Sequence, residues 1–118
     1  MLIFQNSTVA GSTLSNWPPL TELDFVKVLE GVPMHRGAHH YGNFGEPLQV
    51  GVWECTPGKF EYTYPGNEIC TVLSGRVEIT DAQGRRVVLI KGDILFTTKG
   101  ETVTWDIKDT VRKAFLIC

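Results

Sequence analysis

The stretch EICTVLSGRVEIT, Glu68–Thr80, consists of two runs rich in β-branched residues with a serine and a glycine between them. In the second run the apolar residues Val77 and Ile79 alternate with charged and polar neighbours. Successive side chains of a strand point to opposite faces, so this alternation predicts a strand with one buried face. Glycine tolerates the dihedral angles of a turn. The stretch therefore predicts two short strands of an all-β domain, Ile69–Leu73 and Arg76–Thr80.

The same pattern of short β-rich runs extends from Leu48 to the end of the chain. Every break between runs contains Gly, Pro, Asn or Asp, the residue types that favour turns. Eight short strands at regular spacing, with no long helical period, predict a β-sandwich or a barrel. The predicted strands are Leu48–Thr56, Lys59–Tyr64, Ile69–Leu73, Arg76–Thr80, Arg85–Ile90, Ile94–Thr97, Thr102–Ile107 and Val111–Cys118.

The first 45 residues differ from the rest because they carry clusters of Ser, Thr, Asn, Gly and Pro. Proline fixes φ and lacks an amide donor, which argues against long helices and central strands here. The apolar run Leu23–Leu29 suits either a strand or one short helix. We expect residues 1–45 to form an N-terminal arm packed on a barrel of residues 46–118.

The final strand, Ala114–Cys118, is apolar on both faces. A strand of that composition is usually buried on both sides. We therefore expect its outer side to be covered by the arm or by a second subunit, and we predict a homodimer.

Composition excludes several classes of partner. A chain of 118 residues has the length of one domain, and its net charge of −2 comes without any run of Lys or Arg. Nucleic acid needs a cationic surface, so it is not an expected partner. The apolar stretches are too short to cross a membrane, and the start does not resemble a signal peptide. The three cysteines form no CxxC pair, which favours reduced thiols and a cytoplasmic protein.

Two motifs resemble the cupin superfamily, the RmlC-like jelly rolls. Glu68 followed by a short strand and Gly75 is similar to the end of the first cupin motif. The segment from Gly92-Asp93 to Gly100 is similar to the second motif. The resemblance implies a double-stranded β-helix, the cupin jelly-roll barrel.

A narrower resemblance runs from about Gly51 to Ile117. Trp53–Phe60, Trp105 and Val111–Lys113 are similar to the small cupins related to ureidoglycine aminohydrolase and to the ethanolamine-utilisation cupin protein. Folds host many chemistries, so this resemblance predicts the fold more firmly than it predicts the function.

The resemblance also indicates that the usual cupin metal site is absent. It places the metal-binding histidines at Tyr62, Tyr64 and Val103, and of the expected ligands only Glu68 is present. A phenol with a pKa near 10 is a poor ligand at neutral pH, and valine cannot ligate. A single carboxylate does not hold a transition metal. We expect no metal and no other cofactor.

The predicted binding pocket is aromatic with a few polar groups, as small-molecule sites usually are. It is formed by Phe60, Tyr62, Tyr64, Glu68, Val103, Trp105 and Lys113. An inward carboxylate must be paired or neutralised, so Glu68 is interpreted equally as half of a structural ion pair with Lys113 or as a ligand-binding group. The tyrosines suit either the core or the site, and Cys70 is interpreted as an inert buried thiol.

The histidines of the chain, His35, His39 and His40, all lie in the predicted arm. We interpret His39-His40-Tyr41 as part of a glycine-rich surface loop. The alternative is that His39 or His40 folds over the barrel mouth and, with Glu68 and a tyrosine, forms a new polar or metal-binding site.

The favoured function is a small-molecule-binding cupin without the usual metal site. An enzyme similar to ureidoglycine aminohydrolase, acting on a small nitrogenous metabolite, is one alternative. A non-catalytic structural or interaction module is the other.

Overall fold

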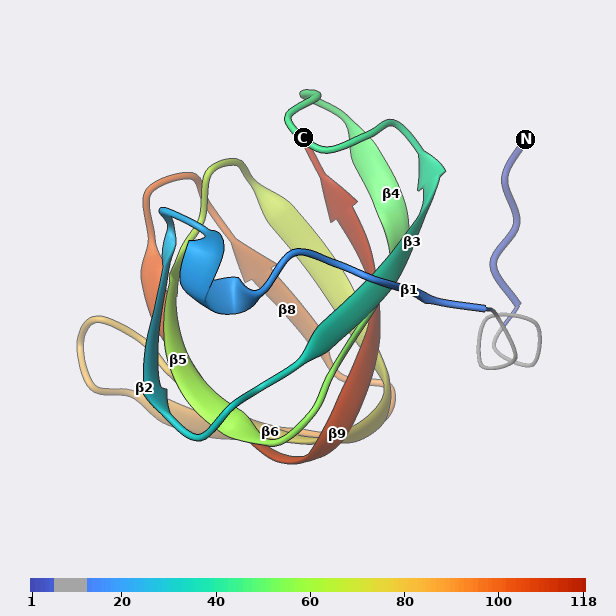
Figure 1. The fold of residues 1–118 in the computed structure, drawn as a ribbon. Coiled ribbons are helices and arrows are strands. Elements are labelled where there is room, and N and C mark those ends of the chain that lie inside the picture. The colour runs from blue at the N-terminus through green and yellow to red at the C-terminus, as the bar shows by residue number, and fades with distance from the viewer. Residues whose placement is uncertain (6–12) are drawn as a thin grey trace.

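The computed structural model describes residues 1–5 and 13–118 and shows an all-β protein, as predicted (Figure 1). All strand pairs are antiparallel, and no helix of the described residues is long and apolar enough to span a membrane. In chain order the elements are β1 (Ser15–Asn16), the short 3-10 helix η1 (Leu20–Glu22), β2 (Val26–Glu30), β3 (His35–Tyr41), β4 (Gln49–Cys55), β5 (Gly58–Thr63), β6 (Glu68–Thr80), β7 (Arg86–Leu89), β8 (Ile94–Thr97) and β9 (Thr102–Ile117).

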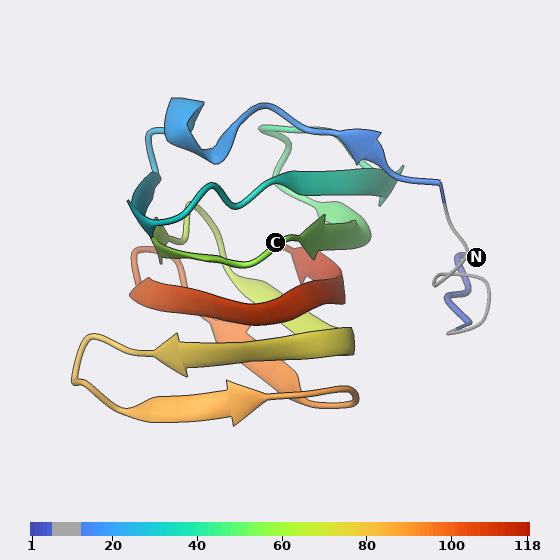
Figure 2. The same ribbon diagram turned by 60° about the horizontal axis from the view of Figure 1, so that its bottom comes forward.

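The strands form one curled sheet. Its main path runs β1-β3-β4-β9-β5-β2, and β6 joins this path through β9 while also pairing with β7 and β8. Figure 2 shows β3, β4, β9, β6 and β7 side by side, in the order of their hydrogen bonds. Because β9 pairs with β4, β5 and β6, it is the strand around which the sheet curls.

Two of the predicted strand breaks are wrong. The runs on either side of Ser74-Gly75 form the single strand β6, and the runs around Lys108-Asp109 form β9. The two long strands stay paired past the predicted breaks, with shifts of register between Val72 and Val77. Gly75 has a φ of +88°, and a Cβ there would lie 2.1 Å from the carbonyl oxygen of Thr110. The glycine therefore bends the paired strands, because only a residue without a side chain fits against β9.

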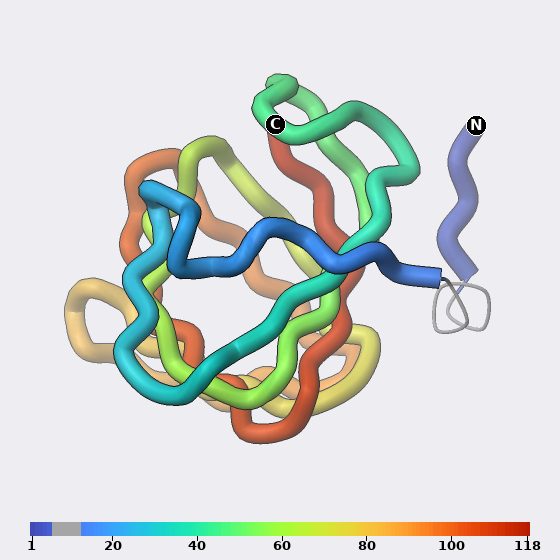
Figure 3. The backbone as a smooth tube through the Cα atoms, in the orientation of Figure 1, coloured from blue at the N-terminus to red at the C-terminus, as the bar shows by residue number. Residues whose placement is uncertain are grey.

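The first 45 residues contribute strands to the same sheet. β2 pairs with β5, β3 pairs with β4, and β1 pairs with β3. Residues 6–12 of the predicted arm lie outside the described residues. The ambiguous run Leu23–Leu29 leads into the strand β2. Between β1 and β2 the chain crosses one side of the curled sheet, as the tube in Figure 3 shows.

The predicted loop at His39-His40-Tyr41 is also wrong. These residues belong to β3, where His39 lies opposite Gly51 of β4 and a shift of register precedes Tyr41. The glycines that suggested a loop border the strand or lie within it. Backbone pairing with β4 makes this segment regular, and that pairing joins Tyr41 to Val50 and His39 to Gly51, beyond the turn that separates the two strands.

The core lies on the concave side of the sheet. Phe60 and Trp105 face each other across β5 and β9, with parallel rings and centroids 6.4 Å apart. The predicted alternation is confirmed, since Val77 and Ile79 are buried on the same side. The other members of the core cluster are Leu20, Trp53, Cys55, Tyr64, Cys70, Val72, Leu89, Val103, Ile107, Val111 and Phe115.

The outer side of the last strand is not covered by any described part of the arm. Leu116 of β9 lies between Ile69 of β6 and Val50 of β4, and Ile69 lies opposite Phe96 of β8. The exposed fractions of Leu116, Ile69 and Phe96 are 37%, 43% and 61%. Cover by a second subunit stays a prediction.

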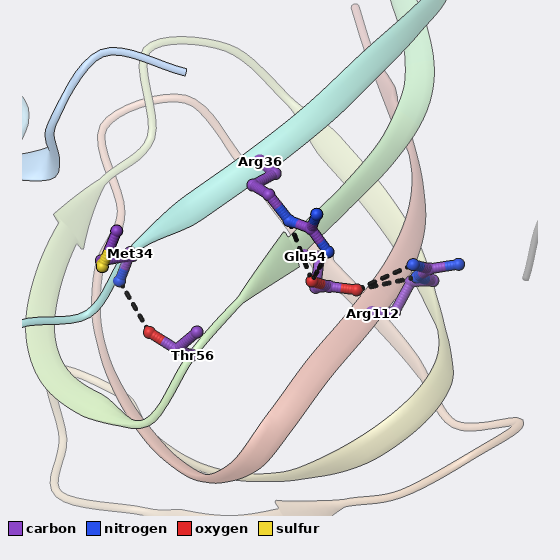
Figure 4. Close-up of polar contacts among 5 residues, drawn as sticks. All are labelled: Met34, Arg36, Glu54, Thr56 and Arg112. Carbon is purple, nitrogen blue, oxygen red and sulfur yellow. Dashed lines mark hydrogen bonds and ion pairs between the residues drawn. The ribbon is translucent and has the colours of Figure 1, made fainter. Parts of the chain in front are cut away.

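On the same outer face, ion pairs between charged side chains join β3, β4 and β9 (Figure 4). Glu54 of β4 accepts hydrogen bonds from Arg36 of β3 and, at 2.8 Å from Oε2 to Nη2, from Arg112 of β9. Burial raises the pKa of Glu54, but the two arginines outweigh burial and hold that pKa below its usual value. Beside them the amide of Met34 donates to Thr56 Oγ1 at 2.8 Å.

Candidate functional site

A cavity of about 730 Å3 opens on the concave side of the sheet, within the range typical of small-molecule sites. Six of the seven predicted pocket residues line it: Phe60, Tyr62, Tyr64, Glu68, Trp105 and Lys113. Val103 does not; it is buried in the core opposite Tyr62. Residues that the sequence-based prediction omitted also line the cavity, among them Trp17, Leu20, Phe25, His35, His39, Phe44, Gln49, Trp53, Phe115 and Ile117.

A buried ion pair joins two strands at the wall of the cavity. Lys113 Nζ on β9 lies 2.5 Å from Glu68 Oε2 on β6, and the exposed fractions of the two side chains are 9% and 6%. The ammonium also lies 4.9 Å and 4.8 Å from the ring centroids of Trp53 and Trp105, as in a cation–π contact. Burial lowers the pKa of Lys113, but the charge and hydrogen bond of Glu68, together with the influence of Cys70 and Tyr64, outweigh burial and raise that pKa, so the lysine stays charged.

The two tyrosines of β5 and the following turn have different roles. Trp105 Nε1 donates to Tyr64 Oη at 3.1 Å, which makes Tyr64 part of the core. No hydrogen bond to the Tyr62 hydroxyl exists among residues 1–5 and 13–118. Burial, with the negative charge of Glu68, raises the pKa of Tyr62 to about 12. Tyr62 is therefore a neutral phenol that can donate to, or accept from, a molecule in the cavity.

Glu68 has one oxygen available as well. Its Oε2 is paired with Lys113, and no described residue donates to Oε1. Among the described residues no fully buried side-chain oxygen or nitrogen lacks a partner, so Oε1 must be open to the cavity. Cys70 lies on the same face of β6, and burial raises the pKa of its thiol. A protonated thiol in this position is not an activated nucleophile.

Trp17 closes one side of the cavity. Its ring lies on the backbone of β3, where a Cβ at Gly37 would be 2.2 Å from a ring carbon of Trp17. The ring stacks on His39 with centroids 5.1 Å apart and an interplanar angle of 17°. It also contacts the edge of Phe44 at 4.8 Å. Glycine at position 37 is thus what allows the tryptophan to reach the cavity.

His35 anchors the chain that follows Trp17. Trp53 Nε1 donates to His35 Nδ1 at 3.0 Å, and His35 Nε2 donates to the carbonyl oxygen of Pro18 at 2.5 Å. An indole nitrogen only donates and a carbonyl only accepts, so His35 is neutral with its proton on Nε2. Burial lowers the pKa of His35, which favours the same neutral form.

His35, Gly37 and His39 occupy alternate positions of β3 and share its inner face, whereas His40 is exposed and contacts Phe4. The alternate spacing of His35 and His39 could have predicted that His39 lines the cavity, but only if the segment had been recognised as a strand. The contribution of Trp17 had no such signal, because the residue precedes two prolines in a segment without periodicity.

These residues do not fit a cupin metal. Tyr62 and Tyr64 are protonated phenols, Val103 lies in the core, and Glu68 is already paired with the ammonium of Lys113. In the described part of the chain, no group of three or more His, Cys, Asp or Glu side chains could hold a metal ion. Neither His39 nor His40 belongs to such a group.

The curled antiparallel sheet with a cavity on its concave side is the architecture of a cupin. The chain belongs to the family of EutQ-like cupin domains, whose family model matches residues 43–115. Among solved structures it is similar to the EutQ protein of Clostridium difficile, with a TM-score of 0.62 and 23% identity over 72% of this chain and 68% of that one. The resemblance inferred from the sequence motifs is thereby confirmed.

Two other solved structures extend this picture. A DUF861 family protein of Thermotoga maritima is 34% identical, with a TM-score of 0.54, over 57% of this chain and 76% of that one. A DUF861 family protein of unknown function from Pseudomonas syringae reaches a TM-score of 0.78 at 21% identity, over 92% of this chain but only 45% of that one. No curated protein matches this chain. Together these likenesses establish a cupin fold.

Proposed function

We propose that this protein binds an uncharged small molecule in the barrel cavity, without a metal ion. The observation that carries the proposal is that two polar atoms beside the buried ion pair, Glu68 Oε1 and the hydroxyl of Tyr62, have no hydrogen-bond partner among the described residues. They belong to a cavity that several aromatic side chains line, among them Trp53, Phe60 and Trp105.

The ion pair argues for an uncharged ligand. Glu68 and Lys113 neutralise each other, so a charged ligand would bring an additional, uncompensated charge beside this buried pair. Burying such a charge costs several kcal/mol or more. Glu68 Oε1 can only accept a hydrogen bond, and the Tyr62 hydroxyl can donate one. A carboxamide head group, which both donates and accepts, suits these two atoms.

The walls suit a flat apolar body behind that head group. Phe60, Trp105 and Phe115 line the cavity from β5 and β9. Aromatic faces stack on planar ligands and exclude water around the polar contacts. The proposed ligand is therefore a small ring compound with an uncharged donor group.

Three probes of similar shape test the proposal: benzamide, benzoate and benzamidine are uncharged, anionic and cationic. Each is titrated while backbone amide NMR shifts and tryptophan fluorescence are followed. We expect benzamide to bind about tenfold more tightly than either charged probe, a difference of about 1.4 kcal/mol. The shifted amides should lie on β5, β6 and β9. Tyr62→Phe should weaken benzamide binding, whereas Tyr41→Phe, at an exposed tyrosine of β3, should not.

Three other outcomes of this titration would count against the proposal. Tighter binding of benzoate or benzamidine would overturn the uncharged ligand class. Conversion of benzamide to benzoate, visible in the spectrum of the probe itself, would support the enzymatic alternative. Absence of binding by all three probes would support a non-catalytic interaction module.

A further inference from the structure

The cavity has a second polar group, two strands away from Glu68. The side-chain amide of Gln49 donates from Nε2 to the carbonyl oxygen of Glu46 at 3.0 Å. This contact orients the amide, so that its oxygen Oε1 lies 2.9 Å from His39 Nε2. An amide oxygen only accepts, and His39 Nε2 must therefore carry the proton.

The other ring nitrogen of His39 is left available. No described residue bonds to Nδ1, and since no fully buried side-chain nitrogen of the described residues lacks a partner, Nδ1 is open to solvent. His35, two positions earlier on the same face, uses both of its nitrogens in contacts within the protein. The two histidines therefore differ: His35 is structural, and His39 retains one unused hydrogen-bond acceptor.

The His39 ring is held in place before any ligand arrives. Trp17 stacks on its face at 5.1 Å, and the rings of Phe44 and Phe115 meet it edge-on at 4.6 Å and 6.0 Å. Gln49 fixes its rotation. A preorganised group loses little conformational entropy when it binds, so its hydrogen bond contributes more to affinity.

The strand register separates Glu68 from Gln49, the residue that orients His39. Gln49 of β4 lies opposite Ile117 of β9, and Ile117 lies opposite Glu68 of β6. Neighbouring strands are about 4.8 Å apart, so the Cα atoms of Gln49 and Glu68 are separated by roughly 10 Å. His39 lies one strand further from Glu68, on β3, and contacts the Gln49 side chain, which leaves room for a small ring between His39 and Glu68.

We infer that His39 is the second recognition residue of the cavity and accepts, through Nδ1, a hydrogen bond from the far end of the ligand. This inference rests on the proposed function and narrows it. The ligand class becomes a small ring compound with an uncharged hydrogen-bond donor at each of two opposite ends, one for Glu68 and one for His39.

The test compares 4-hydroxybenzamide with 4-methoxybenzamide at pH 8, where free imidazole is neutral. Both carry an oxygen at the far end of the ring, but only the hydroxyl donates. The wild-type protein should bind the hydroxyl compound about three- to tenfold more tightly, the worth of one net hydrogen bond. His39→Gln places its amide where Nε2 was and should abolish this preference. His39→Asn places an oxygen near the position of Nδ1 and should retain it.

His40→Gln on the opposite face is the matched control and should leave the preference unchanged. A long-range proton–nitrogen NMR spectrum of the imidazole gives a readout that does not depend on any probe. It should show the proton of His39 on Nε2, and a proton on Nδ1 instead would overturn the inference directly.

The binding data separate the two proposals. If benzamide binds in the cavity but the hydroxyl preference is the same in the wild type and in His39→Gln, only the role of His39 is wrong. If none of the benzamides binds, the proposed function is wrong and the inference falls with it.

Discussion

Lys113 and Glu68, 45 residues apart in the sequence, form an ion pair 2.5 Å long on the wall of the cavity. The resemblance to cupins places the carboxylate of a metal site at Glu68. In this protein the carboxylate is instead paired with an ammonium group that belongs to the chain itself. The pair joins β6 to β9 and leaves one oxygen of Glu68 available to a ligand.

Glu68→Gln should destabilise the protein by about 3–5 kcal/mol, because it leaves the buried ammonium of Lys113 unpaired. Adding Lys113→Met should restore most of that loss, since the pair is then replaced by uncharged groups of similar size. Urea denaturation of the single and double variants measures both effects.

Glu30→Gln is the control for this prediction. Glu30 pairs with Lys59 at 4.0 Å on the surface, where an ion pair contributes less than about 1 kcal/mol. A loss of stability in Glu68→Gln no larger than in Glu30→Gln would show that Glu68 is not needed to neutralise Lys113.

The two cavity tyrosines should respond in opposite ways to the loss of their hydroxyls. Tyr64→Phe removes the acceptor of Trp105 Nε1 and leaves a buried donor unsatisfied, at a cost of about 1–3 kcal/mol. Tyr62→Phe removes no hydrogen bond made within the described residues and should change stability by less than about 0.5 kcal/mol. Thermal and urea denaturation of the two variants check the contrast. Equal losses would indicate that Tyr62 is also a structural residue.

The stability of the protein should fall as the pH is lowered from 7 toward 5, and His35 should contribute to the fall. Burial holds the pKa of His35 below its usual value of 6.5. Between the folded and unfolded pKa values the unfolded chain binds more protons, so acidification favours unfolding. The contribution of His35 is present above the unfolded pKa and is lost as the pH falls toward the folded one. Glu54, whose pKa is lowered from 4.5, acts in a separate and more acidic window.

Urea denaturation between pH 5 and 8 measures this dependence. His35→Gln should be less stable at pH 7 but should show a weaker change with pH, because the titrating group is gone. His40→Gln, at an exposed position, should keep the slope of the wild type. An identical slope in the wild type and in His35→Gln would contradict the assignment.

We predict that two copies of the chain pair through the row formed by Phe96, Ile69 and Leu116 on the outer face of β8, β6 and β9. This row is apolar, continuous across three strands and exposed. Phe96→Glu should therefore halve the mass measured by sedimentation equilibrium. Val88→Glu, at an exposed position of β7 outside the row, should leave the mass unchanged. A wild-type protein that sediments as a single chain would contradict the prediction.

Much of the cavity could be predicted from local sequence because side-chain direction in a strand alternates with every residue. Alternation in β5 and β9 placed Phe60, Tyr62, Trp105 and Lys113 on the inner side, and the structure agrees. The cupin resemblance also placed Val103 in the predicted pocket, and Val103 lies in the core. Alternation identifies which residues of a strand face inward. It does not tell which of these inward residues lie in the packed core and which line the cavity.

The wrongly predicted strand breaks at Gly75 and at Lys108-Asp109 show a second limit of prediction from local sequence. A glycine with positive φ occurs both in a turn that reverses the chain and in a bend within a paired strand. The partner strand decides between the two, because β6 and β9 remain hydrogen-bonded past both positions. No window of sequence around Gly75 contains that partner.

The sequence by itself determined the all-β class, the family resemblance and the absence of histidines from the usual metal positions, since these depend on residue types and short spacings. The tertiary structure decided the rest of the site. It paired β3 with β4, brought Trp17 over Gly37 and turned His39 into the cavity. It also brought Lys113 against Glu68, where two charges that would be costly to bury alone neutralise each other. Such contacts depend on the register between distant strands, which only the folded chain establishes.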